Sequence, residues 1–201
     1  MSVEPARRDL EAIYSNLDRM YNIVVKIVTD TLRSLEEWRV NDALEDHLYL
    51  AENLSAVVEE QATFFIAKYQ PLGPELLEAK SLIRTSYDLY RIARYCREIN
   101  RVIAYTSRGG RTLKPSQQVR KAAEIVASMV GDAYKAYRTR DNELRRKVEE
   151  TDNMIDRIYD TMLERIGKVE SLSQTEAVDL LIVRHLERIA DHAVYIARQA
   201  E

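Results

Sequence analysis

The stretch LERIADHAVYI at residues 186–196 decides the fold, because it repeats an earlier stretch, LYRIARYCREI at residues 89–99. The leucine, the Arg-Ile-Ala triplet and the final isoleucine coincide, and both stretches have the three- and four-residue apolar spacing of amphipathic helices. Residues 27–30, IVTD, likewise match MVGD at residues 129–132. Chance agreement between amphipathic helices is the alternative, but the turn positions agree too. A repeat of about one hundred residues is therefore predicted.

Apolar spacing continues along nearly the whole chain and predicts an all-α protein with three long helices in each repeat. Glycine and proline, which end helices, cluster at residues 71–74 and 109–115. Short connections favour antiparallel neighbours, so we expect two tandem three-helix bundles of the spectrin-repeat kind, at residues 1–108 and 115–201. The predicted helices cover residues 10–38, 41–70, 74–107, 117–140, 143–169, and from the capping box at 173–176 onward.

Composition excludes several classes of protein. The chain has 201 residues, 46% of them apolar and 31% charged, which is typical of a folded domain. The net charge of −3 argues against a nucleic-acid binder. No apolar run reaches the roughly 18–20 residues of a membrane helix, and the N-terminus lacks the apolar core of a signal peptide. The single cysteine, Cys96, fits a reducing compartment, so a cytoplasmic location is predicted.

Two pairs of carboxylates are the candidate functional residues. Glu187 and Asp191 are four residues apart, as are Asp152 and Asp156 on the preceding helix. On a helical wheel each pair borders the buried apolar stripe. If the two helices pack antiparallel, the four carboxylates converge and repel one another unless a positive group lies between them. Oxygen ligands suit a hard cation such as Mg²⁺, Ca²⁺, Mn²⁺ or iron, with Zn²⁺ also in the candidate set, so a metal site of unknown ion is predicted.

Ion pairing is the alternative for these four acids. The arginines near them in sequence are Arg157, Arg184, Arg188 and Arg198. A carboxylate on a helix surface commonly pairs with a neighbouring cation three or four residues away. Spacing alone leaves both interpretations open.

Histidine and motif content argue against an enzyme. The three histidines, His47, His185 and His192, form no Glu-x-x-His motif of the ferritin-like di-iron kind. On the last helix the two histidines point away from the acid pair, so surface or interface positions are expected. No phosphate-binding loop, nucleophile–base pair or paired-cysteine site is present. A di-metal oxidase or hydrolase would need histidine ligands or an open catalytic position, and neither is indicated.

The segment LERIADHAVYIA at residues 186–197 closely resembles the signature of PhoU proteins, the regulators of phosphate uptake. The resemblance implies two tandem three-helix bundles with acidic pairs on the second and third helix of each. It also implies metal ions at Asp152, Asp156, Glu187 and Asp191, often as multinuclear clusters. The implied partners are the phosphate ABC transporter and a sensor histidine kinase, with homodimers common, contact with the membrane only through a partner, and no catalysis.

The first repeat departs from that family pattern. Its matching positions are Glu52, Ala56, Tyr90 and Arg94, so only one of four acids is kept and a guanidinium replaces another. Arginine stays protonated at any ordinary pH and repels a cation. Metal is therefore predicted in the second repeat only. A helical scaffold or transporter accessory protein, without metal-dependent regulation, is the alternative function that this degenerate repeat favours.

One face of residues 74–107 carries the arginines Arg84, Arg91, Arg94, Arg97 and Arg101. The first interpretation is a solvated face paired with acids of the preceding helix, such as Glu45, Asp46, Glu59 and Glu60. The second is a docking surface for an anionic partner or a phosphate-bearing ligand, whose binding would weaken with salt.

Overall fold

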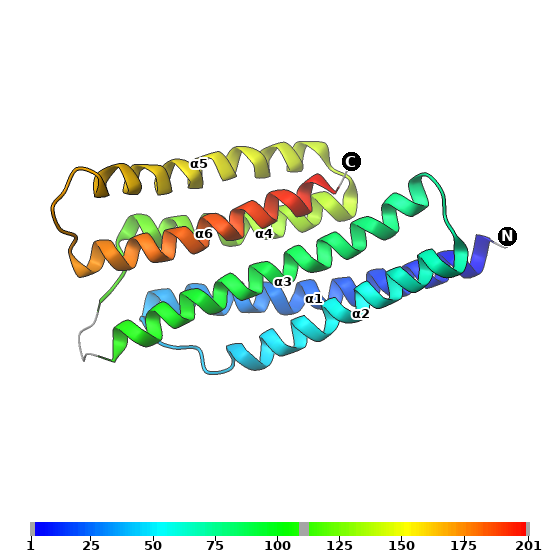
Figure 1. Cartoon of the computed structure of the whole chain (residues 1–201), viewed down its shortest axis with the longest axis horizontal. Coiled ribbons are helices and arrows are strands. Elements are labelled where there is room, and N and C mark those ends of the chain that lie inside the picture. Colours follow the sequence, from blue (N-terminus) through cyan, green and yellow to red (C-terminus); the bar gives the residue numbers. More distant parts are fainter. Residues whose placement is uncertain (1–2, 109–112, 200–201) are drawn as a thin grey trace.

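The computed structural model describes residues 3–108 and 113–199 and contains six helices in that part of the chain (Figure 1). Their bounds are α1 Val3–Glu37, α2 Leu44–Tyr69, α3 Pro74–Ser107, α4 Gln117–Thr139, α5 Asn142–Ile166 and α6 Gln174–Arg198. The all-α prediction is confirmed. None of these helices combines the length and apolar character required to cross a membrane.

The first helix begins at Val3 rather than at residue 10, and two further predicted helix ends move by a few residues. The second helix begins at Leu44 rather than near Asn41. The Asn41 side-chain oxygen accepts the Ala43 N–H, and the backbone N–H of Asn41 donates to the side-chain oxygen of Asn100 on α3. The fifth ends at Ile166, where the Gly167 N–H still bonds to the Leu163 carbonyl. Both shifts reflect end geometry that periodicity does not report. The predicted capping box of α6 is present, with Ser173 and Glu176 bonded reciprocally.

The helices form two bundles that lie side by side (Figure 1). Helices α1, α2 and α3 all contact one another, as do α4, α5 and α6. Between the bundles, α3 packs on α6 and α1 packs on α4. Helix α6 therefore has neighbours from both bundles, and Ala190, Ala193 and Ala197 are fully buried along it. These small side chains allow the close approach of three neighbouring helices, which explains the strong pattern of this segment.

The seam between the bundles contains polar groups as well as apolar ones. Tyr21 on α1 stacks on Tyr134 of α4 with ring centroids 4.0 Å apart, and the Tyr134 hydroxyl donates to Asp18 at 2.6 Å. Burial, followed by this carboxylate, raises the pKa of Tyr134. Because buried polar groups need specific partners, these bonds fix how one bundle sits on the other.

Candidate metal centre

Helices α5 and α6 pack against each other and bring the four predicted acids together. All four side chains are half-buried. Burial, followed by the charges of Asp156, Asp191 and Glu187, raises the pKa of Asp152 to about 6. The carboxylates of the two helices therefore face one another, as the spacing predicted.

The α5 side of this acid cluster (Asp152, Asp156, Glu187 and Asp191) lacks compensating charge. Among the described residues neither Asp152 nor Asp156 forms an ion pair, and Oδ1 of Asp152 is buried with no hydrogen-bond partner. Burial, followed by the charges of Asp191 and Asp160, also raises the pKa of Asp156. A buried carboxylate oxygen without a partner is costly, so this side is suited to a cation.

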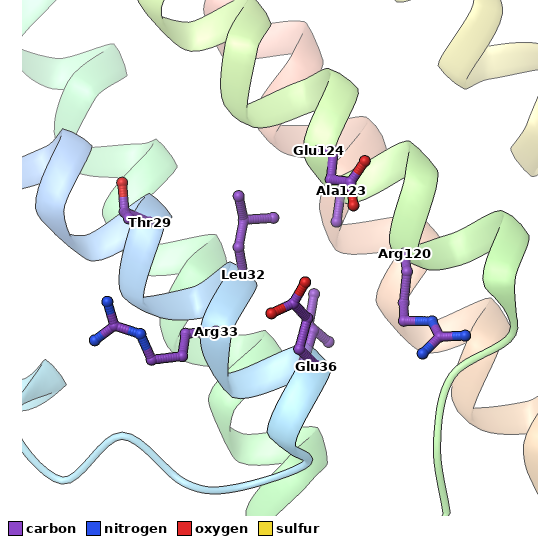
Figure 2. Close-up of a pocket in the computed structure, with 8 residues that line it drawn as sticks. Thr29, Leu32, Arg33, Glu36, Arg120, Ala123 and Glu124 are labelled. Atoms are coloured by element: carbon purple, nitrogen blue, oxygen red, sulfur yellow. The ribbon is translucent and has the colours of Figure 1, made fainter.

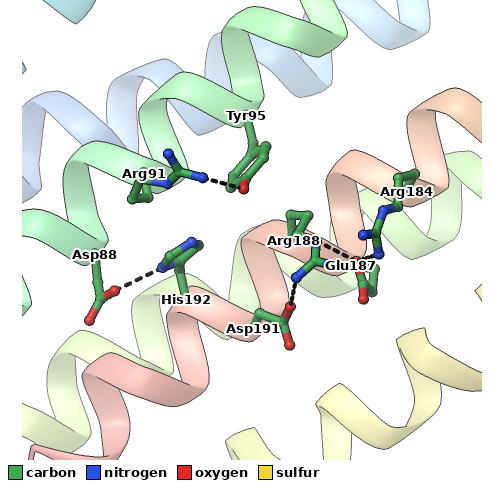
Figure 3. A network of polar contacts seen from close by, with 8 residues as sticks. All are labelled: Asp88, Arg91, Tyr95, Arg184, Glu187, Arg188, Asp191 and His192. Atoms are coloured by element: carbon green, nitrogen blue, oxygen red, sulfur yellow. Dashed lines mark hydrogen bonds and ion pairs between the residues drawn. The ribbon is translucent and has the colours of Figure 1, made fainter.

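Arginines occupy the α6 side of the cluster, as Figure 3 shows. Arg184 donates to Glu187 at 2.7 Å, and Arg188 donates to Asp191 at 3.0 Å. Arg188 also lies 3.4 Å from the Glu187 carboxylate. The pairing interpretation thus holds for the α6 acids with these two arginines.

The other two candidate arginines do not complete that pairing. Arg198 binds Glu149 at 2.9 Å, and Arg157 is exposed and forms no ion pair with any described residue. The charge of Arg198 lowers the pKa of Asp152, but burial and the three neighbouring carboxylates raise it more strongly. The pairing interpretation is therefore wrong for the α5 acids.

The cluster fits a hard cation in its chemistry but is not a ready-made cage. Within residues 3–108 and 113–199, no three carboxylate, histidine or cysteine side chains stand close enough to form a finished metal site. A cation held by Asp152 and Asp156 would recruit Asp191 and Glu187 away from their arginines. The donor set and the unpartnered Asp152 oxygen fit a metal, since a cation satisfies four carboxylates at once.

A hollow between α1 and α4, shown in Figure 2, lies on other helices than the acid cluster. It has a volume of about 270 Å³. Arg33 and Arg120 line it together with Glu36 and Glu124, so its charges balance. It offers neither the carboxylate set of a metal site nor the excess charge of an anion site.

Comparison with known proteins places the chain in a family. A model of the PhoU domain matches residues 17–103 and 119–200, one segment in each bundle. The chain belongs to the PhoU family. This confirms the resemblance drawn from residues 186–197.

Relatives and solved structures agree with that assignment. A Thermotoga maritima protein named phosphate-specific transport system accessory protein PhoU homolog 1 is 26% identical, covering 92% of this chain and 83% of the relative. A Pseudomonas putida homologue is 29% identical over 92% of this chain and 75% of its own length. The crystal structure of PhoU from Pseudomonas aeruginosa matches with a TM-score of 0.85 at 24% identity, covering 96% of each chain. PhoU from Streptococcus pneumoniae matches with a TM-score of 0.82 at 18% identity, covering 97% of this chain and 94% of its own. Both structures show the shared fold.

In the first PhoU repeat, a hydrogen bond takes the place of the acid cluster. The Tyr90 hydroxyl donates to Glu52 at 2.8 Å, and the Arg94 guanidinium lies over the Tyr90 ring, 6.0 Å from its centroid. Ala56 supplies no ligand. Glu52 is therefore engaged beside a fixed positive charge, which supports the prediction of no metal there.

The predicted arginine face of α3 is not uniform. Arg84, Arg94 and Arg101 are exposed, whereas Arg91 and Arg97 are half-buried. Arg101 pairs with Glu98 on the same helix at 2.8 Å. Arg97 lies 3.5 Å from Glu98 and 4.0 Å from Glu45. Arg91 donates to Tyr95 at 2.6 Å and covers its ring (Figure 3). Arg94 lies over the Tyr90 ring, so intrahelical and aromatic contacts account for four of the five side chains, and Arg84 is the exception among the described contacts.

One buried polar pair was missed by sequence reasoning. His192 on α6 bonds through Nδ1 to Asp88 of α3 at 2.8 Å (Figure 3). A surface or interface position was expected for this histidine, whereas the structure buries it where α6 packs on α3. The available signal was Asp88 itself, an acid on the apolar stripe of its helix beside Leu89. Aromatic rings surround the imidazole: Tyr87, Tyr95 and Tyr195.

The raised pKa of Asp152 predicts how the metal-free protein responds to pH. The pKa of Asp152 is about 6 in the folded protein and 3.8 in its ordinary, unfolded state. Its protonated form therefore stabilises the fold fully below pH 3.8, and this contribution to the free energy of unfolding is lost as pH rises through 6. We expect Asp152→Asn to stabilise the metal-free protein at pH 7 by about 1 kcal/mol, since solvent screens a half-exposed group. Thermal unfolding in chelator at pH 4 and pH 7 measures this. If parent and variant showed the same change in stability between pH 4 and pH 7, the prediction would be contradicted.

Proposed function

We propose that this chain is a PhoU-type regulator that represses phosphate uptake and phosphate-starvation signalling when phosphate is plentiful. The observation that carries the proposal is the PhoU match in both repeats, shared with relatives named as accessory proteins of phosphate-specific transport systems. The partners we propose are a phosphate ABC transporter, a sensor histidine kinase, or both. The chain would act in the cytoplasm without catalysis, as a homodimer that meets the membrane only through its partner.

The acid cluster supplies the metal-dependent part of this proposal. Asp152, Asp156, Glu187 and Asp191 would hold the ion, whose positive charge would neutralise the cluster and join α5 to α6. Arg184 and Arg188, each 37% exposed, share those α6 carboxylates in the structure. Carboxylates committed to a cation leave both guanidiniums free for an acidic partner. Metal binding and partner docking would thereby be coupled, because the carboxylates exchange their arginines for the metal and the arginines then bind the partner.

Phosphate uptake in the source organism tests the function. Deleting the gene is expected to raise uptake of labelled phosphate in phosphate-rich medium, and the parent chain is expected to restore repression. The Asp152→Asn/Asp191→Asn variant should fold but fail to repress. Unchanged uptake after deletion would overturn the regulatory proposal.

The second candidate is a helical scaffold or transporter accessory protein whose role is independent of metal. The first repeat favours it, since the one acid kept there, Glu52, accepts a hydrogen bond from Tyr90. The same uptake experiment separates the two functions. Full repression by the Asp152→Asn/Asp191→Asn variant would favour the scaffold.

A further inference from the structure

A second pocket, far richer in positive charge, lies where the two bundles meet at the C-terminal end of α6. It has a volume of about 410 Å³ and is lined by the beginning of α3, the α4–α5 turn and the end of α6. Its basic residues are Lys80 and Arg84 on α3, Arg140 in the turn and Arg198 on α6, and its one described acid is Glu78. Three separate elements thus contribute positively charged side chains to the lining of one pocket.

The charges of this basic pocket are largely uncompensated. Among the described residues, Lys80, Arg84 and Arg140 form no ion pair or side-chain hydrogen bond. Arg198 is paired with Glu149 at 2.9 Å, and Glu78 already accepts a hydrogen bond from Tyr14 of α1 at 2.8 Å. The hollow between α1 and α4 differs, because its two arginines are matched by two glutamates (Figure 2). Like charges held together without counter-ions are unfavourable unless an anion joins them.

We propose that this pocket binds a small ligand through a diphosphate group. Arginine binds phosphate oxygens through a planar fork of N–H donors, and lysine adds a point charge. Three unpaired cations match a diphosphate better than a single carboxylate, and the volume falls within the roughly 300–1,000 Å³ of small-molecule sites. The pocket shares no residue with the acid cluster, so this proposal goes beyond the proposed function and does not rest on it.

The diphosphate has two possible sources, which the neighbouring surface can distinguish. An adjoining hollow of about 430 Å³ lies beside the basic pocket and shares Arg84 and Gln199 with it. Tyr87 and Tyr195, both exposed, line this adjoining hollow. Their rings offer a stacking surface for a base, which a nucleotide would use and free inorganic diphosphate would not.

The α4–α5 turn allows a variant that removes a cation with little harm to the fold. Arg140 ends α4 in the left-handed region at φ 54°, and Asp141 next to it caps α5 by accepting the Glu143 and Leu144 N–H groups. Glycine adopts that backbone without steric cost and is the usual residue at such a helix end. Arg140→Gly should therefore leave the turn intact.

Calorimetric titration of the metal-free full chain with sodium pyrophosphate and with ADP tests the proposal. One site is expected, with affinity that falls as salt rises and that drops about tenfold or more in Arg84→Gln/Arg140→Gly. Arg33→Gln/Arg120→Gln is the matched control, because it removes the same charge from the balanced hollow and should bind like the parent. Tighter binding of ADP than of pyrophosphate would identify a nucleotide, and equal binding an inorganic diphosphate. No binding of either probe, or equal loss in both double variants, would overturn the proposal.

Discussion

Protein purified without chelator or metal-affinity resin is expected to contain metal in stoichiometric amount, and Asp152→Asn/Asp191→Asn to contain only traces. The reason is that Asp152 keeps a buried oxygen without a partner, while burial and then three other carboxylates raise its pKa. A cation would supply a partner for that oxygen and offset the repulsion among the carboxylates. Elemental analysis measures the content. Thermal unfolding adds a second readout, since a ligand at one hundred times its Kd stabilises the fold by about 2.7 kcal/mol.

Glu52→Gln is the matched control for that measurement. It removes one carboxylate from the corresponding place in the first repeat, where the amide oxygen of glutamine can still accept from Tyr90. Metal content should stay at the parent level, because Arg94 opposes a cation there. Equal trace metal in all three proteins would mean that Arg184 and Arg188 satisfy the α6 acids and that no site forms. Loss of metal in Glu52→Gln would overturn the assignment to the second repeat.

The helices and the acid cluster were predictable because both depend on local spacing. Apolar periodicity placed five of the six helices within a few residues of their bounds and began α1 at residue 10 rather than at Val3. Four-residue spacing placed each acid pair beside a buried stripe. Short turns then fixed α5 and α6 as antiparallel neighbours, so the two pairs had to converge. No knowledge of distant contacts was needed for either result.

Contacts between the bundles were not predictable in the same way. The bond between Asp88 and His192 joins residues 104 positions apart and depends on the register of α3 against α6. The basic pocket depends on that register too, because Arg84 and Arg198 come from different bundles. Arg101 forms an ion pair with Glu98, three residues away on the same helix, whereas the sequence pattern predicted pairing with acids of the preceding helix. Several partners are within reach of a long side chain, and only the packed structure selects one.

His192→Ala is expected to lower the free energy of unfolding by about 3 kcal/mol, because it leaves the Asp88 carboxylate buried without a partner. The two side chains are only 11% and 9% exposed, and the bond between them is 2.8 Å long. Asp88→Ala in the His192→Ala background should cost far less than it does alone, since the unpaired group is then gone. Urea unfolding of the parent, both single variants and the double variant completes the cycle.

His185→Ala is the control that separates this bond from the loss of a buried ring. His185 lies two turns earlier on α6, packs on the same Tyr95 at 6.1 Å between ring centroids, and its Nδ1 has no hydrogen-bond partner among the described residues. Burial lowers its pKa, and removing the ring takes no hydrogen-bond partner from a buried carboxylate. We expect a cost of about 1 kcal/mol, from packing alone. If His192→Ala costs no more than His185→Ala, the buried pair does not hold α3 to α6, and the bundles are joined by apolar contact and the Tyr21–Tyr134 stack instead.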